Sequence, residues 1–148
     1  MRKRVLLVED HPDTSDIIQR ELSFVGYDVL IAENGLQAVA FAAHLLPDVI
    51  VMDMKLPKLN GHEATVRIRE NPKTASIPIL AATALTGPGE REKCLAAGCN
   101  DYLAKPFTYR ELDRAIRKLL QPDNSSESSE EKASESVGKK VGSGSEGS

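Results

Sequence analysis

Residues 49–53 read Val-Ile-Val-Met-Asp, a short apolar run that ends on a carboxylate. Three further apolar runs end on polar residues in the same way: 5–8 on Glu9 and Asp10, 79–82 on Thr83, and 102–104 on Lys105. Such continuous apolar runs are typical of strands covered on both faces, as in parallel sheets. The carboxyl ends of parallel strands lie at one edge of the sheet, where open α/β folds bind ligands. The pattern therefore predicts that three carboxylates, a hydroxyl and an amine gather around one crevice.

The rest of the first 121 residues predicts one more strand, near 29–31, and a helix after each strand. Capping pairs mark two helix starts, Asn34 with Gln37 and Thr108 with Glu111. The first helix should begin near Pro12, and its expected buried face is Ile17, Ile18, Leu22 and Val25. Alternating strands and helices of this length require a parallel sheet with right-handed crossovers. We therefore predict a doubly wound (βα)5 fold, a three-layer α/β sandwich with a five-stranded parallel sheet.

Composition divides the 148 residues into a domain, 1–121, and a Ser/Glu/Gly-rich tail, 122–148. The tail has no aromatic residue and almost no large apolar side chain, so we expect it to be disordered. It holds six of the 22 acidic and three of the 19 basic residues, which leaves the domain neutral. A neutral domain without a basic stripe predicts no nucleic-acid partner. No run approaches the ~20 apolar residues of a membrane span, so we expect no membrane contact and a cytoplasmic location.

The cysteines and histidines do not form a recognisable metal or disulfide motif. Cys94 and Cys99 flank a helix end, and in a reducing compartment they are expected to be small buried apolar residues rather than a redox pair. His11, His44 and His62 are scattered without metal-ligand spacing. The sequence therefore predicts no zinc site.

The predicted crevice has the composition of a site for phosphoryl chemistry. Glu9, Asp10 and Asp53 would form an all-oxygen site of the kind that magnesium prefers. Burying three carboxylates without a cation would be very costly, so a metal is close to a requirement of this geometry. Lys105 and Thr83 could neutralise and orient a phosphoryl group. Asp53 is then left as the nucleophile, and its attack on phosphorus would give an aspartyl phosphate.

Residues 3–120 resemble the receiver domain of two-component response regulators, the CheY-like family. The similarity runs through V-L-L-V-E-D, V-M-D-M-K-L-P-K-L-N-G, A-A-T-A and Y-L-A-K-P-F, in that order. The resemblance implies the strand order 2-1-3-4-5. Within the family, I-P-I-L-A-A-T-A and A-G-C-N-D-Y are similar to single-domain DivK-type regulators.

The resemblance also implies a role for each site residue. Asp53 would be the phosphoacceptor, and Glu9 and Asp10 would hold Mg²⁺, for which Mn²⁺ can substitute. The backbone carbonyl of Lys55 would complete the metal site, and Lys55 could also shield the acyl phosphate from water. Thr83 would move to bind the phosphoryl group, and Ala84 beside it would leave room for that movement. Lys105 would bridge the phosphoryl group and a carboxylate. Tyr102 would be the aromatic switch residue, and Pro106 would follow a cis peptide bond.

The function expected from these features is a stand-alone receiver that is a switch rather than an enzyme. It would accept phosphate from a sensor histidine kinase or a histidine phosphotransfer protein, and then bind a downstream protein or pass the phosphate on, as a monomer or weak dimer. One alternative is a receiver fragment of a longer regulator or hybrid histidine kinase, with the tail as linker. Another is a Mg²⁺-dependent phosphatase, which usually places a second Asp where this chain has Lys55, a poor proton donor at neutral pH.

Overall fold

The computed structural model describes residues 2–121, and the tail predicted over 122–148 lies outside the described residues. Residues through Arg117 form one compact unit, to which the description below applies. None of the described helices is long and apolar enough to cross a membrane.

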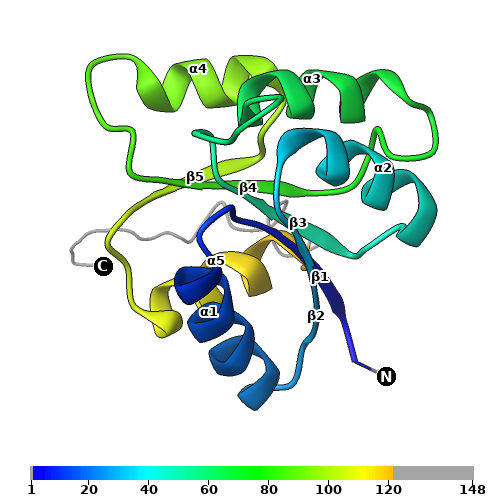
Figure 1. The fold of residues 1–148 in the computed structure, drawn as a ribbon. Helices are drawn as coiled ribbons and strands as arrows, with labels where there is room; N and C mark the ends of the chain where they lie inside the picture. Colours follow the sequence, from blue (N-terminus) through cyan, green and yellow to red (C-terminus); the bar gives the residue numbers. More distant parts are fainter. Residues whose placement is uncertain (1, 122–148) are drawn as a thin grey trace. The chain divides into compact units, whose positions relative to one another are not determined.

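Five strands alternate with five helices, as the sequence predicted (Figure 1). The strands are β1 (Arg4–Val8), β2 (Asp28–Ala32), β3 (Val49–Met52), β4 (Ile79–Thr83) and β5 (Asp101–Ala104). The helices are α1 (Pro12–Phe24), α2 (Gly35–Leu45), α3 (Gly61–Glu70), α4 (Glu90–Ala97) and α5 (Tyr109–Leu119). All neighbouring strands pair in parallel, in the order β2-β1-β3-β4-β5, so the predicted fold and strand order are confirmed.

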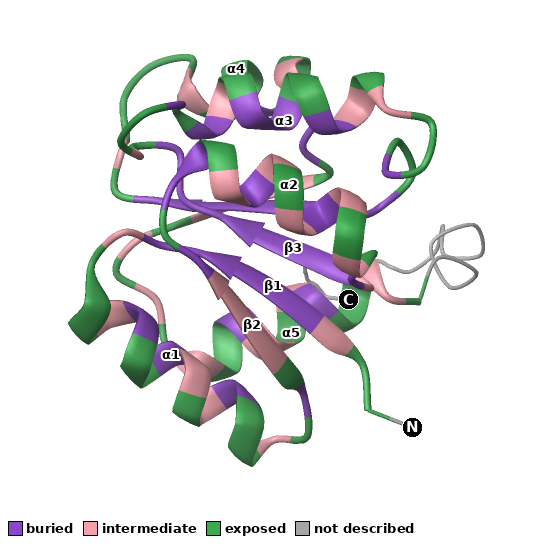
Figure 2. Cartoon of the chain, turned by 45° about the vertical axis from the view of Figure 1, so that its right-hand side comes forward, coloured by how far each residue is buried: buried purple, intermediate pink, exposed green. Residues whose placement is uncertain are grey.

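The sheet lies between two helical layers, with α2, α3 and α4 over one face and α1 and α5 over the other (Figures 1 and 2). The runs Val5–Val8 and Val49–Met52 are completely buried, which explains why they contain only apolar residues. The edge strands β2 and β5 are largely half-buried, and their sequences accordingly mix apolar with polar residues. Burial therefore follows the order of the strands across the sheet.

The predicted caps are present at the helix starts. The Asn34 side chain accepts a hydrogen bond from the Gln37 N–H at 2.8 Å, and the Gln37 side chain accepts one from Glu33 at 2.8 Å. Thr108 and Glu111 form the reciprocal capping box, with backbone-to-side-chain bonds of 2.8 and 3.1 Å. The Thr108–Glu111 pair satisfies two N–H groups at the start of its helix, whereas Gln37 bonds to Glu33, one residue before the Asn34 cap, so the Asn34–Gln37 pair is not a reciprocal capping box.

The predicted buried face of α1 was wrong at Ile17 and at Val25, which is only half-buried and lies at the C-cap, beyond the last helical residue. Ile17 is 56% exposed, whereas Ile18 and Leu22 are buried. The buried stripe of α1 is Ser15, Ile18 and Leu22, with the three- and four-residue spacing of one helix face. Ile17 lies about 100° around the helix from Ile18 because an α-helix has ~3.6 residues per turn. Its side chain therefore points away from the core.

Candidate functional site

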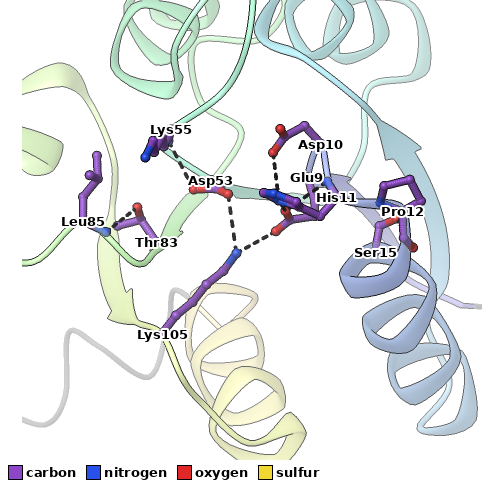
Figure 3. A network of polar contacts seen from close by, with 10 residues as sticks. All are labelled: Glu9, Asp10, His11, Pro12, Ser15, Asp53, Lys55, Thr83, Leu85 and Lys105. Atoms are coloured by element: carbon purple, nitrogen blue, oxygen red, sulfur yellow. Dashed lines mark hydrogen bonds and ion pairs between the residues drawn. The ribbon is translucent and has the colours of Figure 1, made fainter.

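The sheet fixes the backbone of the predicted site residues. Glu9, Asp53 and Lys105 directly follow β1, β3 and β5. Their N–H groups donate to the carbonyl of the last residue of the neighbouring strand, over 3.0, 3.1 and 2.9 Å respectively. The parallel hydrogen-bond pattern thus continues one residue past each strand. The structure brings the three side chains together at the carboxyl edge of the sheet, where the sequence placed them (Figure 3).

Lys105 joins two carboxylates. Its Nζ lies 2.7 Å from Glu9 Oε1 and 3.4 Å from Asp53 Oδ2. The two carboxylate side chains are only 2% and 9% exposed, and that of Lys105 is 22% exposed. Burial lowers the pKa of Lys105, but the contacts with Glu9 and Asp53 outweigh burial and raise it. The lysine is therefore a stable cation in this site.

Asp53 is a buried carboxylate with few stabilising donors. Burial raises its pKa, and Lys105 together with the Lys55 N–H, which donates to Asp53 Oδ1 over 3.2 Å, only partly opposes this effect. Glu9 raises the Asp53 pKa further by charge repulsion. The site thus disfavours the charged form of its own central residue unless more positive charge is supplied.

Asp10 has an oxygen atom that is available for a cation. Its Oδ1 is buried and accepts no hydrogen bond from residues 2–121. His11 Nδ1 lies 3.3 Å from this oxygen, close enough for an ion pair but without hydrogen-bond geometry. Glu9, in contrast, is already engaged, since Oε1 contacts Lys105 and Oε2 contacts His11 Nδ1 at 3.1 Å. The orphaned Asp10 oxygen and the Asp53 carboxylate fit a hard divalent ion, which takes oxygen ligands.

His11 is a member of the site that sequence reasoning missed. The Glu9 hydrogen bond, followed by the charges of Asp10 and Glu9, raises the pKa of this exposed imidazole. The signal in the sequence is weak, because the only hint is that His11 directly follows two acidic residues.

Thr83 and Tyr102 are linked through one residue. The buried Thr83 Oγ1 accepts a hydrogen bond from the Leu85 N–H over 3.1 Å. The Tyr102 hydroxyl, from β5, donates to the Leu85 carbonyl over 2.8 Å. Ala84, which lies between Thr83 and Leu85 in the chain, is exposed. A change at the Thr83 hydroxyl can therefore reach Tyr102 through Leu85.

The cis Lys105–Pro106 peptide bond that the resemblance implies is present.

The loop that follows Asp53 is held in place by Gly61 at the start of α3. Its N–H donates to Met54 O over 2.9 Å, and a Cβ atom on Gly61 would lie 2.3 Å from Asp53 O. Only glycine permits this close approach of α3 to the loop.

A groove of about 890 Å³ opens beside the site. It lies between α1 and the segment that follows β5, and Lys105 and Ala84 belong to its lining. The apolar lining includes Ile17, Pro106 and Phe107. The exposed Ile17 that departs from the predicted core thus belongs to this apolar surface.

Comparison with known proteins gives a consistent family match. The family described as the response regulator receiver domain matches residues 5–117. The DNA-binding dual master transcriptional regulator RpaA of Synechocystis is 38% identical over 118 residues, covering 80% of this chain and 49% of the relative. Response regulator MprA of Mycobacterium leprae is 39% identical over 128 residues, covering 84% and 55%. The chain thus spans about half the length of the curated relatives it matches.

Solved structures similar to this chain agree with the family match. The receiver domain of a sensor histidine kinase from Pseudomonas aeruginosa, determined with a magnesium ion in the active site cleft, is 42% identical with a TM-score of 0.76. The alignment covers 81% of this chain and 98% of that one. Chemotaxis protein CheY4 of Vibrio cholerae is 29% identical with a TM-score of 0.76, covering 81% and 100%.

Proposed function

This chain belongs to the response regulator receiver domain family, and we propose that it is a phosphoacceptor switch in which Asp53 accepts a phosphoryl group. The observation that carries the proposal is the environment of Asp53. It is a buried carboxylate directly after β3, in contact with Lys105, and the same sheet edge carries the Asp10 oxygen that accepts no hydrogen bond from residues 2–121. The carboxylates at this edge carry more negative charge than Lys105 alone can balance. A bound cation would offset that charge and leave Lys105 free to bind a phosphoryl group.

In the transfer step that we propose, an Asp53 carboxylate oxygen attacks the phosphorus of a phosphohistidine. The P–N bond breaks, its electron pair goes to the imidazole nitrogen, and that nitrogen takes a proton from solvent. Lys105 can turn from Asp53 Oδ2 to a phosphoryl oxygen while its backbone stays fixed. The Thr83 hydroxyl can donate to a second phosphoryl oxygen, because Oγ1 uses only an acceptor position for Leu85.

The metal ligands that we propose are the carboxylates of Asp10 and Asp53, with Glu9 beside them, and the backbone carbonyl of Lys55. When bound, Mg²⁺ would offset carboxylate charge and coordinate a phosphoryl oxygen. The Pseudomonas relative with magnesium in its cleft supports this choice. We expect Mn²⁺ to substitute, since it also favours oxygen ligands.

Phosphorylation would act on the segment between β4 and α4. A phosphoryl group that draws the Thr83 hydroxyl toward Asp53 would pull on Leu85, whose carbonyl is bonded to Tyr102. We therefore assign Tyr102 as the switch residue and the exposed Ala84 as the position that leaves space for the movement. The changed surface would then be read by a downstream protein.

The donor that we propose is a sensor histidine kinase or a histidine phosphotransfer protein, docked on the groove between α1 and the segment after β5. A donor must bring its histidine to Asp53, and Lys105 belongs both to the site and to the groove. Ile17 and Phe107 would supply the apolar contacts. Replacing Ile17 with Asp should slow transfer from a phosphorylated donor protein but leave transfer from a small phosphodonor unchanged. Equal slowing of both reactions would contradict the proposal that the donor docks on this groove.

The decisive experiment on Asp53 is intact-mass analysis after incubation of the full chain with Mg²⁺ and a small phosphodonor. The parent and an exposed-surface control, Asp16→Asn, should each gain one base-labile phosphoryl group, and Asp53→Asn should gain none. EDTA should abolish the reaction in the parent. Phosphorylation of Asp53→Asn, or none of the parent, would contradict the proposal. Steady hydrolysis of phosphate monoesters would instead favour the phosphatase alternative.

We propose that the receiver acts as a stand-alone regulator, with a DivK-type protein as the expected relative. The alternative, a receiver segment of a longer regulator or hybrid kinase, is supported by relatives about twice as long as the matched region. One of these relatives is named as DNA-binding. In a longer regulator of that kind, another domain would bind DNA, so our expectation of no nucleic-acid partner applies to residues 1–121 alone. The open reading frame around these codons would decide between the two settings.

A further inference from the structure

Three side chains with metal-binding atoms meet between α3 and α4, away from the strand ends. His62 is the second residue of α3, Glu90 is the first residue of α4, and Cys94 lies one turn further along α4. The His62 and Glu90 side chains are 16% and 14% exposed, and Cys94 is completely buried. The separation of 28 residues between His62 and Glu90 hides this cluster in the sequence.

The spacing of the three atoms matches one face of a tetrahedral metal site. Bond lengths of about 2.3 Å to sulfur, 2.05 Å to nitrogen and 2.0 Å to oxygen place tetrahedral zinc ligands about 3.6 Å (S to N), 3.5 Å (S to O) and 3.3 Å (N to O) apart. The corresponding distances here are 3.8 Å from Cys94 Sγ to His62 Nε2, 3.6 Å from Cys94 Sγ to Glu90 Oε2, and 3.1 Å between His62 Nε2 and Glu90 Oε2. Each observed separation lies within about 0.2 Å of the tetrahedral value.

The donor atoms select the class of metal. Thiolate and imidazole suit Zn²⁺ and similar transition metals, whereas Mg²⁺ prefers oxygen. Three protein ligands leave a fourth position for water, which can approach beside the partly exposed His62 and Glu90. Metal binding would displace the proton of the Cys94 thiol, because a coordinating thiol is deprotonated.

We propose that His62, Glu90 and Cys94 bind a transition metal ion, Zn²⁺ or a close chemical equivalent, and that the ion fastens α4 to α3. The site differs in place and chemistry from the oxygen site at Asp53. Without the ion, the Glu90 carboxylate accepts from the Cys94 thiol and pairs with His62, so the same geometry is kept by hydrogen bonds. The experiment must therefore detect a bond between the metal and sulfur, not only the stability of the cluster.

Cobalt(II) is the probe, because it takes tetrahedral zinc sites and gives a near-ultraviolet charge-transfer band only when a thiolate is bound. It is titrated into the full 148-residue chain with saturating Mg²⁺ and a phosphine reductant, and Zn²⁺ is then added. We expect a band that saturates at one cobalt per chain and disappears on zinc addition. The Cys94→Ser variant should lack the band, and its zinc affinity should fall by at least the ~10–100-fold that loss of an outer partner costs a metal site.

Matched controls separate this site from others. Cys99 is also buried and free, but its thiol contacts the Thr65 hydroxyl and only its backbone N–H bonds to Cys94, so Cys99→Ser should keep the band. Asp53→Asn should keep it as well, which makes the test independent of the proposed phosphorylation. If Cys94→Ser does not fold, His62→Asn, with the exposed His44→Asn as its control, gives the same answer through lost affinity. No thiolate band in the parent, or an equal band in Cys94→Ser, overturns the proposal.

Discussion

Replacing Lys105 with Met tests whether this lysine keeps the two buried carboxylates stable in the folded protein. Methionine retains the apolar stem and removes the ammonium group that lies 2.7 Å from Glu9 and 3.4 Å from Asp53. Breaking a fully buried ion pair on one side costs about 3–5 kcal/mol, because it leaves an uncompensated charge. Lys105 is 22% exposed, so water can replace part of its effect. We therefore expect a loss of about 2–3 kcal/mol in the free energy of unfolding at neutral pH without metal.

The pH dependence of this loss follows from the pKa shifts. Burial raises the Asp53 pKa, so the folded protein holds this proton more tightly than the unfolded chain. Asp53 therefore lowers stability as pH rises from the ordinary Asp pKa through its folded pKa. Without Lys105 that folded pKa is higher still, so the deficit of the variant should shrink in acid, where Asp53 is protonated. The Lys105 pKa is raised, so its contribution is complete below the ordinary lysine pKa and is lost as pH rises through the folded value.

Urea unfolding of the parent and the variant over a pH series in EDTA measures this difference. The deficit should be largest near neutral pH and smaller at both extremes, and added Mg²⁺ should recover part of it by supplying positive charge. The matched control is Lys55→Met, which removes an exposed ammonium from a residue that contacts Asp53 through its backbone. The control should change stability by less than about 0.5 kcal/mol. A Lys105→Met variant as stable as the parent, or a deficit independent of pH, would refute the reasoning.

Three further predictions concern positions that support the site and the fold. Gly61→Ala should cost about 1–3 kcal/mol in urea unfolding and slow phosphorylation, because the added Cβ would lie 2.3 Å from Asp53 O; unchanged phosphorylation would show that the loop adjusts freely. Arg69→Met should cost at least about 2 kcal/mol, since this half-buried guanidinium donates to four backbone carbonyls and one side chain, and Arg69→Lys should recover only part. Asn34→Ala should cost about 1 kcal/mol through loss of the cap on Gln37, whereas Asn34→Asp should stay close to the parent.

The fold was predictable because one signal recurs along the whole domain. Each apolar run is short enough to be a strand, and a helical pattern follows it, with recognisable capping pairs at two of the helix starts. The error at Ile17 has a specific cause. Neighbouring apolar residues at 17 and 18 fit two different faces of a helix, and only packing on the sheet decides between them. Periodicity alone could not show that Ile17 belongs to a groove.

The site was only partly predictable. Strand ends could be located from the sequence, and the parallel sheet then brings Glu9, Asp53 and Lys105 to one edge. Side-chain choices could not be read in this way. Nothing in the pattern indicates that Lys105 lies closer to Glu9 than to Asp53, or that one oxygen of Asp10 lacks a partner. The same limit applies to the cluster between α3 and α4, whose members come together only through helix packing.

The backbone hydrogen bonds indicate where this domain can respond to phosphorylation. The N–H groups of Glu9, Asp53 and Lys105 are bonded to neighbouring strands, so these three positions cannot shift without breaking the sheet pattern. The segment after Thr83 differs, because the Leu85 N–H is held by the Thr83 side chain instead of by a strand. A phosphoryl oxygen at Asp53 could accept a hydrogen bond from the Thr83 hydroxyl and draw Oγ1 away from the Leu85 N–H at little cost to the sheet. An edge held by strand pairing therefore adjoins a segment held by a side chain, and in the switch that we propose this difference in restraint would direct the conformational change toward residues 84–89.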